Sequence, residues 1–107
     1  MSASPTSAVA ESAAPATEPT LEDVLGALSD PVRMRIVRTL AAEEGGRACG
    51  TFDLPVTKST ASHHFKVLRE AGVIRQEERG RTKHTTLRRD ELEARFPGLL
   101  ALVLRER

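Results

Sequence analysis

Apolar residues begin to recur at helical spacing near residue 21. The i, i+3, i+4, i+7 spacing of a helix with one buried face is followed by Leu21, Val24, Leu25 and Leu28. Thr20 stands directly before this run, and its hydroxyl suits the N-cap position. The pattern therefore predicts that the folded part of the chain begins with a helix at Leu21.

A second helix is predicted to start at Pro31. The run Ser29-Asp30-Pro31 joins a capping residue to a proline at the first helical position, where the missing N–H costs nothing. The expected buried face consists of Val32, Ile36, Val37, Leu40 and Ala41. The other sides carry Arg33, Arg35 and Arg38. We expect Gly45 and Gly46 to end this helix.

The next stretch is irregular and leads into a third helix. Residues 47–56 keep neither helical nor strand periodicity for long, which predicts a short turn-like element. Thr57 then suits an N-cap, and the following helix runs from Lys58 to Ala71, with Gly72 after its end. Its inward positions are Ala61, Phe65 and Leu68.

The pattern changes to short β-prone segments from Val73 to Leu87. Gly80 and Arg81 lie between these segments, and a type II′ turn with glycine first would join them into a hairpin. The expected cross-strand pairs are Ile74 with Leu87, Gln76 with Thr85, and Glu78 with Lys83. The hairpin would then have an apolar base and a polar, charged tip.

A last helix is predicted with Asp90 as its cap, bent or split by Pro97-Gly98. One face of this helix carries Leu92, Phe96, Leu99, Leu100 and Val103. Leu102 and Leu104 widen the apolar surface beyond one stripe, and such a helix buries its excess against a partner. The expected dimer interface therefore consists of Leu21, Val24, Leu25, Leu99, Leu100 and Val103.

Length and composition favour one small domain in the cytoplasm. The 107 residues allow a single core over 21–107, which a second copy would help to complete. Residues 1–20 are almost entirely Ala, Ser, Pro, Thr and Glu, which predicts a disordered tail. No apolar run is long enough to span a membrane, and no secretory signal pattern opens the chain.

Charge is distributed unevenly along the chain. Residues 1–31 hold five acidic side chains and no Lys or Arg, whereas Thr57 to Arg89 hold nine Lys and Arg and three acidic side chains. A basic segment of this kind suits a phosphate backbone, although a solvated basic surface would give the same count.

Two blocks of residues resemble the ArsR (arsenic repressor) family. They are LSDPVRMRI over residues 28–36 and STASHHFKVLREAGVI over residues 59–74, and the resemblance extends from about Leu21 to Leu104. It implies a winged helix-turn-helix fold, mainly α with a small β-hairpin as the wing. It also implies a homodimer formed through the first and last helices, a palindromic operator, and repression relieved by a signal such as a small-molecule effector.

Position by position, the resemblance assigns the DNA contacts to the helix from Lys58 and to the wing. The base edges would be contacted by Lys58, Ser59, Ser62 and His63. Phosphates or the minor groove would be contacted by Thr57, Thr60, Lys66, Arg69, Arg79, Arg81 and Lys83. Lys66 could instead pair with Glu70 at i+4, and the wing residues could form a solvated hairpin tip.

The sequence departs from the metal-sensing members of that family. Cys49 stands alone and no histidine follows His84, so no metal site and no cofactor are expected. His63 and His64 are adjacent and point about 100° apart on a helix, which prevents a shared metal. Cys49 lies close to Arg47, so a thiol-redox-responsive regulator is one alternative.

Two further alternatives concern the function class. A winged helix can serve as a protein–protein interaction module, but Lys58, Lys66 and Arg69 on the third helix favour DNA. An enzyme would need a nucleophile with its base, or a phosphate loop or metal motif, and the sequence contains no such pattern. The sequence therefore predicts a DNA-binding transcriptional regulator that is not an enzyme.

Overall fold

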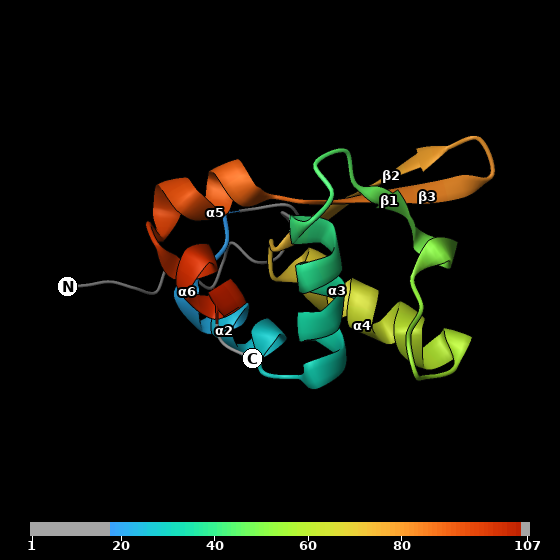
Figure 1. The fold of residues 1–107 in the computed structure, drawn as a ribbon, viewed down its shortest axis with the longest axis horizontal. Helices are drawn as coiled ribbons and strands as arrows, with labels where there is room; N and C mark the ends of the chain where they lie inside the picture. Colours follow the sequence, from blue (N-terminus) through green and yellow to red (C-terminus); the bar gives the residue numbers. More distant parts are fainter. Residues whose placement is uncertain (1–17, 106–107) are drawn as a thin grey trace, which may run out of the picture.

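Five α-helices and one small antiparallel sheet make up residues 18–105, the part of the chain that the computed structural model describes (Figure 1). The helices are α2 (Leu21–Leu28), α3 (Pro31–Ala41), α4 (Lys58–Glu70), α5 (Arg89–Arg95) and α6 (Leu99–Arg105). The sheet has the strand order β1 (Arg47–Ala48), β3 (Thr82–Leu87), β2 (Ile74–Arg79). The predicted disordered tail covers residues 1–20, and its residues 1–17 lie outside the described part of the chain.

The first two helices begin at the predicted caps. The Thr20 hydroxyl accepts a hydrogen bond from the Asp23 N–H at 3.2 Å, and the Asp30 carboxylate accepts from the N–H groups of Val32 and Arg33. Burial raises the pKa of Asp30, but those backbone hydrogen bonds outweigh it and hold the pKa below its ordinary value. The carboxylate therefore caps α3 in its charged form.

One apolar core joins α2, α3, α4, the hairpin and the C-terminal helices. Its fully enclosed side chains include Val24, Ile36, Val37, Leu40, Leu68, Val73, Ile74 and Leu92. Leu100 of α6 also belongs to this core, with 8% of its surface exposed. Apolar burial of this kind supplies most of the driving force for folding.

The segment between α3 and α4 differs from the prediction. α3 ends at Ala41, before Gly45-Gly46, and residues 47–48 form a strand that pairs with β3 at Thr85 and His84. A 3₁₀ turn, η1 (Cys49–Thr51), follows it. Gly46 has a φ of +83°, and a Cβ there would lie 2.4 Å from the Thr85 carbonyl oxygen, so only glycine allows this close crossing.

The third helix and the hairpin follow the predicted pattern closely. Thr57 caps α4 through a hydrogen bond from the Thr60 N–H, and Gly72 beyond its end has a φ of +85°. Ile74 pairs with Leu87, Gln76 with Thr85 and Glu78 with Lys83, which is the predicted register. Positive φ occurs at Gly80 and not at Arg81, as a type II′ turn requires.

The C-terminal helix is split, and its predicted cap is wrong. Helix α5 ends at Arg95 and α6 starts at Leu99, on either side of Pro97-Gly98. Arg88, rather than Asp90, occupies the N-cap position of α5, without a side-chain cap. The Arg88 N–H donates to the Val73 carbonyl oxygen, so the end of the sheet, rather than an acidic cap, determines where α5 starts.

Candidate nucleic-acid interface

Helix α4 separates a buried face from an exposed polar face. His64, Phe65 and Leu68 are buried. The predicted base-contacting residues are all exposed: Lys58, Ser59, Ser62 and His63. The N-terminal end of α4 and the tip of the hairpin lie at the same end of the molecule (Figure 1). The fold therefore presents a polar helix face together with a basic hairpin, the arrangement that a DNA groove accepts.

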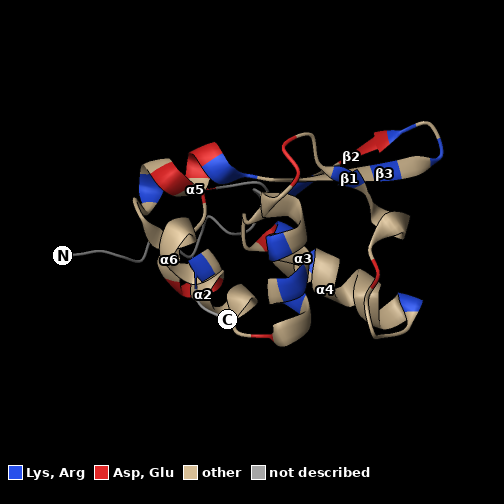
Figure 2. Ribbon diagram, viewed as in Figure 1, with Lys and Arg blue, Asp and Glu red and all other residues tan. Residues whose placement is uncertain are grey.

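Basic side chains gather at this end of the molecule. Figure 2 shows them at the start of α4 and along the hairpin tip. Arg81 and Lys83 are exposed there, and within residues 18–105 neither makes an ion pair. Arg79 lies 3.4 Å from Glu77 in an exposed pair. Such exposed pairs contribute little to stability, so Arg79 can exchange its partner for a phosphate.

Other predicted contact residues already have partners in the protein. Lys66 lies 3.9 Å from the Glu70 carboxylate, the i+4 pair that the sequence offered as an alternative. Thr57 and Thr60 join their hydroxyl groups at 3.0 Å at the helix cap. Arg69 donates from Nη1 to the Gln76 side-chain oxygen at 3.0 Å. These partners leave the residues exposed but orient their side chains.

A buried arginine–histidine contact holds α4 in place, and the sequence did not reveal it. Arg33 was expected on an outer side of α3, but its Nε donates to the Ala27 carbonyl oxygen at 2.7 Å and its Nη1 lies 3.0 Å from His64 Nδ1. Because arginine only donates, Nδ1 of His64 is the acceptor. Arg33 thus connects α2, α3 and α4 and holds His64 in place, while the exposed His63 ring lies 5.9 Å from the His64 ring between centroids.

The chain between η1 and α4 packs against α4 through an aromatic contact. Phe52 follows η1 and packs edge-on against Phe65 of α4, with ring centroids 5.1 Å apart. Phe52 also makes a cation–π contact, with the Arg47 guanidinium 5.6 Å from the centre of its ring. Aromatic packing therefore fixes the chain before α4, a stretch that has no helical or strand periodicity.

Comparisons with known proteins agree with this geometry. A family described as a helix-turn-helix domain matches residues 28–77. The chain is 40% identical over 79 residues to YceK of Bacillus subtilis (strain 168), an uncharacterised HTH-type transcriptional regulator, covering 72% of this chain and 79% of the relative. Its fold superposes on the crystal structure of the ArsR family transcriptional regulator RHA00566 with a TM-score of 0.63 at 20% identity, covering 81% and 98% of the two chains.

A second solved structure, that of M. tuberculosis Rv0081, superposes with a TM-score of 0.58 at 28% identity and covers 78% of this chain and 88% of that one. This chain belongs to the HTH-type transcriptional regulators, and its fold is that of the ArsR family regulator. The predicted winged helix-turn-helix fold and the DNA-binding regulatory function are confirmed. As a regulator of this family, the protein is not an enzyme.

In this regulator the Cys49 thiol is hydrogen-bonded to uncharged groups. Cys49 is half-buried and accepts hydrogen bonds from Gln76 Nε2 at 3.2 Å and from the Thr85 hydroxyl at 3.7 Å. Arg47 is turned away toward the Glu43 carboxylate, with which it forms an ion pair. That hydrogen bond from Arg47 holds the pKa of Glu43 below its ordinary value. Arg47 therefore pairs with Glu43.

Residues 18–105 hold neither a metal-binding cluster nor a membrane-spanning helix. Within them, His, Cys, Asp and Glu side chains form no group of three or more that could hold a metal ion. None of the helices in that part of the chain has the length and apolar character needed to cross a membrane.

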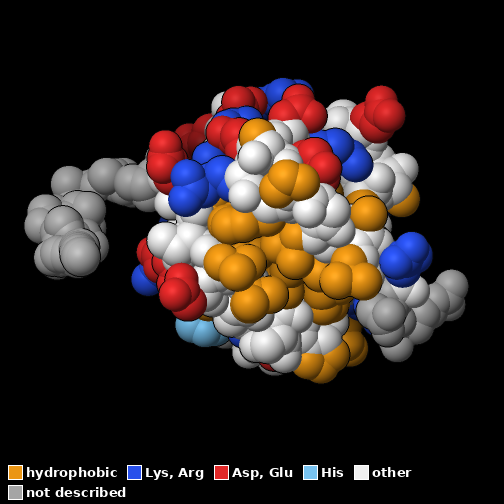
Figure 3. Space-filling view, turned by 90° about the vertical axis from the view of Figure 1, so that its left-hand side faces the viewer, with side chains coloured by type: hydrophobic (Ala, Val, Ile, Leu, Met, Phe, Trp, Pro, Cys, Tyr) orange, Lys and Arg blue, Asp and Glu red, His pale blue; other side chains and the backbone are white. Residues whose placement is uncertain are grey.

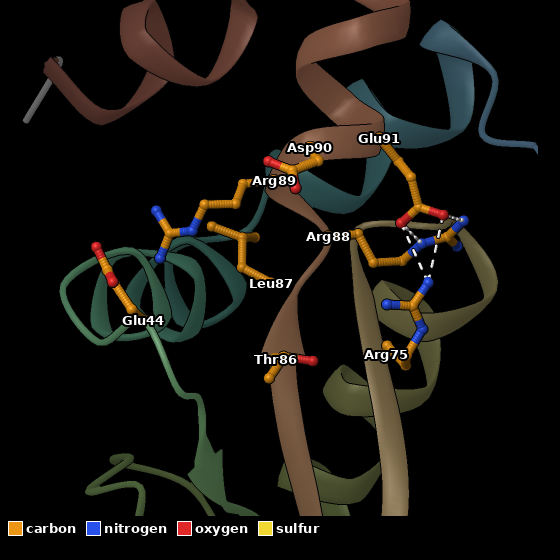
Figure 4. Close-up of a pocket in the computed structure, with 8 residues that line it drawn as sticks. All are labelled: Glu44, Arg75, Thr86, Leu87, Arg88, Arg89, Asp90 and Glu91. Atoms are coloured by element: carbon orange, nitrogen blue, oxygen red, sulfur yellow. Dashed lines mark hydrogen bonds and ion pairs between the residues drawn. The ribbon is translucent and has the colours of Figure 1, made fainter.

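A surface pocket where the hairpin meets α5 is an ionic junction (Figure 4). Arg88 donates twice to the Glu91 carboxylate, at 2.8 and 2.9 Å, and Arg75 of β2 donates to it at 3.2 Å. The hydrogen bonds from Arg88, together with the charge of Arg75, lower the pKa of Glu91. Arg89 donates to the carbonyl oxygens of Leu40 and Ala41 at the end of α3. The guanidinium groups of this pocket therefore connect the wing, α3 and α5 of the regulator.

Proposed function

We propose that this regulator binds a palindromic operator as a homodimer and represses transcription by occupying it. The observation that carries the proposal is the separation of two surfaces. A polar and basic surface, formed by the start of α4 and the wing (Ile74–Leu87), lies at one end of the molecule. An exposed apolar surface, formed by α2 and α6, lies at the other end.

The apolar surface supports self-association. Figure 3 views the molecule from the side of α2 and α6, and hydrophobic side chains form a continuous patch across the middle of that face. Leu21, Leu25 and Leu102 are the large apolar residues with the greatest exposure, at 44%, 47% and 52%. Patches of this kind mark association sites. A second copy would cover the same patch by two-fold symmetry.

Two of the predicted interface residues have little surface left to offer. Val24 is 1% exposed and Leu100 is 8% exposed, because both pack into the core of a single protomer. The interface that we propose therefore uses Leu21, Leu25 and Leu102, together with the half-buried Leu99 and Val103. Leu102, which the sequence only marked as excess apolar surface, is the most exposed of them.

For the DNA contacts, we propose that the exposed face of α4 enters the major groove. Ser59, Ser62 and His63 would contact base edges together with Lys58 at the helix start. Arg69, Arg79, Arg81 and Lys83, with Lys66, would contact phosphates or the minor groove. We assign Thr57 and Thr60 first to capping α4, because their hydroxyl groups are already bonded to each other.

Repression follows from occupancy. A dimer that covers a promoter blocks transcription from it without any further activity. That a small-molecule effector relieves this block stays a prediction. In a two-fold symmetric dimer, half-sites would lie about one helical turn of DNA apart.

The test is a fluorescence-anisotropy titration of the purified protein against duplex DNA from upstream of its own gene, with a scrambled duplex, at two salt concentrations. We expect selective binding of two protomers per site, with an affinity that falls steeply as salt rises. Reporter expression from the same promoter should rise when the protein is deleted. One protomer per site, or equal weak binding to both duplexes, would contradict the proposal.

A further inference from the structure

Gln76 of the wing makes hydrogen bonds to three other parts of the regulator. Its side-chain oxygen accepts from Arg69 Nη1 of α4 at 3.0 Å. Its Nε2 donates to Cys49 Sγ of η1 at 3.2 Å and to the Thr85 hydroxyl oxygen of β3 at 3.3 Å. One amide group therefore joins the recognition helix to both wing strands and to the turn that precedes α4.

The donor and acceptor of each hydrogen bond in this network follow from the chemical groups that form it. Arginine has only donors, so the Gln76 oxygen must face Arg69, and the amide nitrogen must then face Cys49 and Thr85. Thr85 is fully buried and lies directly opposite Gln76 in the hairpin. Its hydroxyl donates a hydrogen bond to Cys49 Sγ at 3.7 Å. Gln76 is thus held by a buried anchor on one side and holds an exposed arginine on the other.

Arg69 keeps most of its hydrogen-bonding capacity. Within residues 18–105 its guanidinium uses one nitrogen, toward Gln76, and an arginine carries five N–H donors in a planar fork. The remaining donors suit a phosphate oxygen. Without Gln76, the exposed and flexible Arg69 side chain would have to lose its rotamer freedom when DNA binds.

We infer that Gln76 is a positioning residue for DNA binding, which presents the Arg69 guanidinium to a phosphate at the junction of the recognition helix and the wing. The inference rests on the phosphate contact of Arg69 in the proposed function. Gln76 itself touches no DNA, and it acts through Arg69.

The test is a double-mutant cycle with Arg69→Ala, Gln76→Ala and the double variant, titrated by anisotropy against one fixed duplex at several salt concentrations. A scrambled duplex is sufficient, because phosphate contacts do not depend on sequence. Thr39→Ala is the matched control, since it removes a hydrogen bond that stays within α3, to the Arg35 carbonyl oxygen. If thermal unfolding shows that the Gln76→Ala variant is unstable, Gln76→Met is used in its place, because methionine keeps the side-chain length.

We expect Gln76→Ala to weaken binding about three- to tenfold, the range that corresponds to ordering one long side chain. The same substitution should change the affinity less than about twofold when Arg69 is already alanine. Arg69→Ala should lower the salt slope by about 0.9, and Thr39→Ala should bind like the natural sequence.

Three results would overturn the inference: an unchanged affinity for Gln76→Ala, an equal loss in both backgrounds, or no effect of Arg69→Ala. None of them concerns operator selectivity or dimerisation. The proposed function fails separately, if the natural sequence does not discriminate the promoter duplex from the scrambled one.

Discussion

At the scale of single residues, this regulator uses similar side chains for different tasks. His63 and His64 are neighbours, yet His63 is exposed on the groove face and His64 is buried against Arg33. Asp30 and Asp90 both precede or open a helix, yet only Asp30 caps one. In each pair the surrounding fold decides which task a residue performs.

Replacing His63 should reduce sequence discrimination without affecting the fold. We expect His63→Ala to lower the ratio of promoter to scrambled affinity about tenfold, because a base-edge contact is lost. The His63 side chain is exposed and its one ring contact is with His64, 5.9 Å away between centroids, so the thermal midpoint should change little. Parallel anisotropy and calorimetry measure both quantities, and an unchanged affinity ratio would remove His63 from the base-reading set.

Replacing Asp30 should destabilise the protein by an amount that depends on pH. Asp30→Ala should lower the free energy of unfolding by about 1 kcal/mol at pH 7, because two N–H groups lose their acceptor. The folded-state pKa of Asp30 is lowered, so this stability is present above the ordinary aspartate pKa of about 3.9 and is lost as pH falls through the folded-state pKa.

Urea unfolding at pH 7 and at low pH measures this change. Asp30→Asn is the matched control, since an amide oxygen still caps the helix but does not titrate in this range. A cost of Asp30→Ala that is the same at both pH values would contradict the charged-cap interpretation.

At the scale of elements, the wing and α4 form one unit. The hairpin is joined to α4 through Gln76 and to α5 through the Glu91 junction. Its inner face changes along its length from the buried pair Ile74 and Leu87 to the exposed pair Glu78 and Lys83. The base of the wing is therefore rigid, while its tip is free to contact DNA.

Removing one basic residue from the wing tip should weaken binding to every duplex. Arg81→Ala should lower the affinity for promoter and scrambled DNA by similar factors and reduce the salt slope by about 1. Arg95→Ala is the matched control, because Arg95 of α5 pairs with Glu18 far from the wing tip and carries the same charge. Equal salt slopes for Arg81→Ala and Arg95→Ala would exclude a phosphate contact at the tip.

At the scale of the whole molecule, the two ends of the fold have different chemistry. The end with the wing tip and the start of α4 is basic, and the face formed by α2 and α6 is apolar. A dimer formed through the apolar face would present two recognition helices to one duplex. Two linked contacts bind far more tightly than one, because the second binding event is intramolecular.

Charging the apolar face should separate the protomers. Leu102→Glu should yield a folded monomer in sedimentation experiments, with operator affinity lower by about a hundredfold. Gly45→Glu is the control, because a side chain there would meet nothing within 4 Å and the residue lies in the loop before β1. Leu100→Glu is unsuitable, since Leu100 belongs to the core and the variant would unfold. A Leu102→Glu dimer would contradict the proposed interface.

What the sequence determined was local. Helix starts at Thr20, Asp30 and Thr57 depend on side chains that bond to N–H groups two or three positions away. The hairpin register depends on a turn at Gly80 and on alternation along each strand. Interactions over such short distances leave a pattern in the chain, so the winged helix could be predicted.

Long-range contacts, by contrast, followed from packing. The strand at Arg47–Ala48, the contact of Arg33 with His64 and the bond of Gln76 to Cys49 join residues far apart in sequence. The start of α5 depends on a bond from Arg88 to Val73 rather than on a cap. One amino-acid sequence carries no pattern that indicates such pairings. Neither partner stands out from its sequence neighbours, and each gains its role only when the packed core brings the two together.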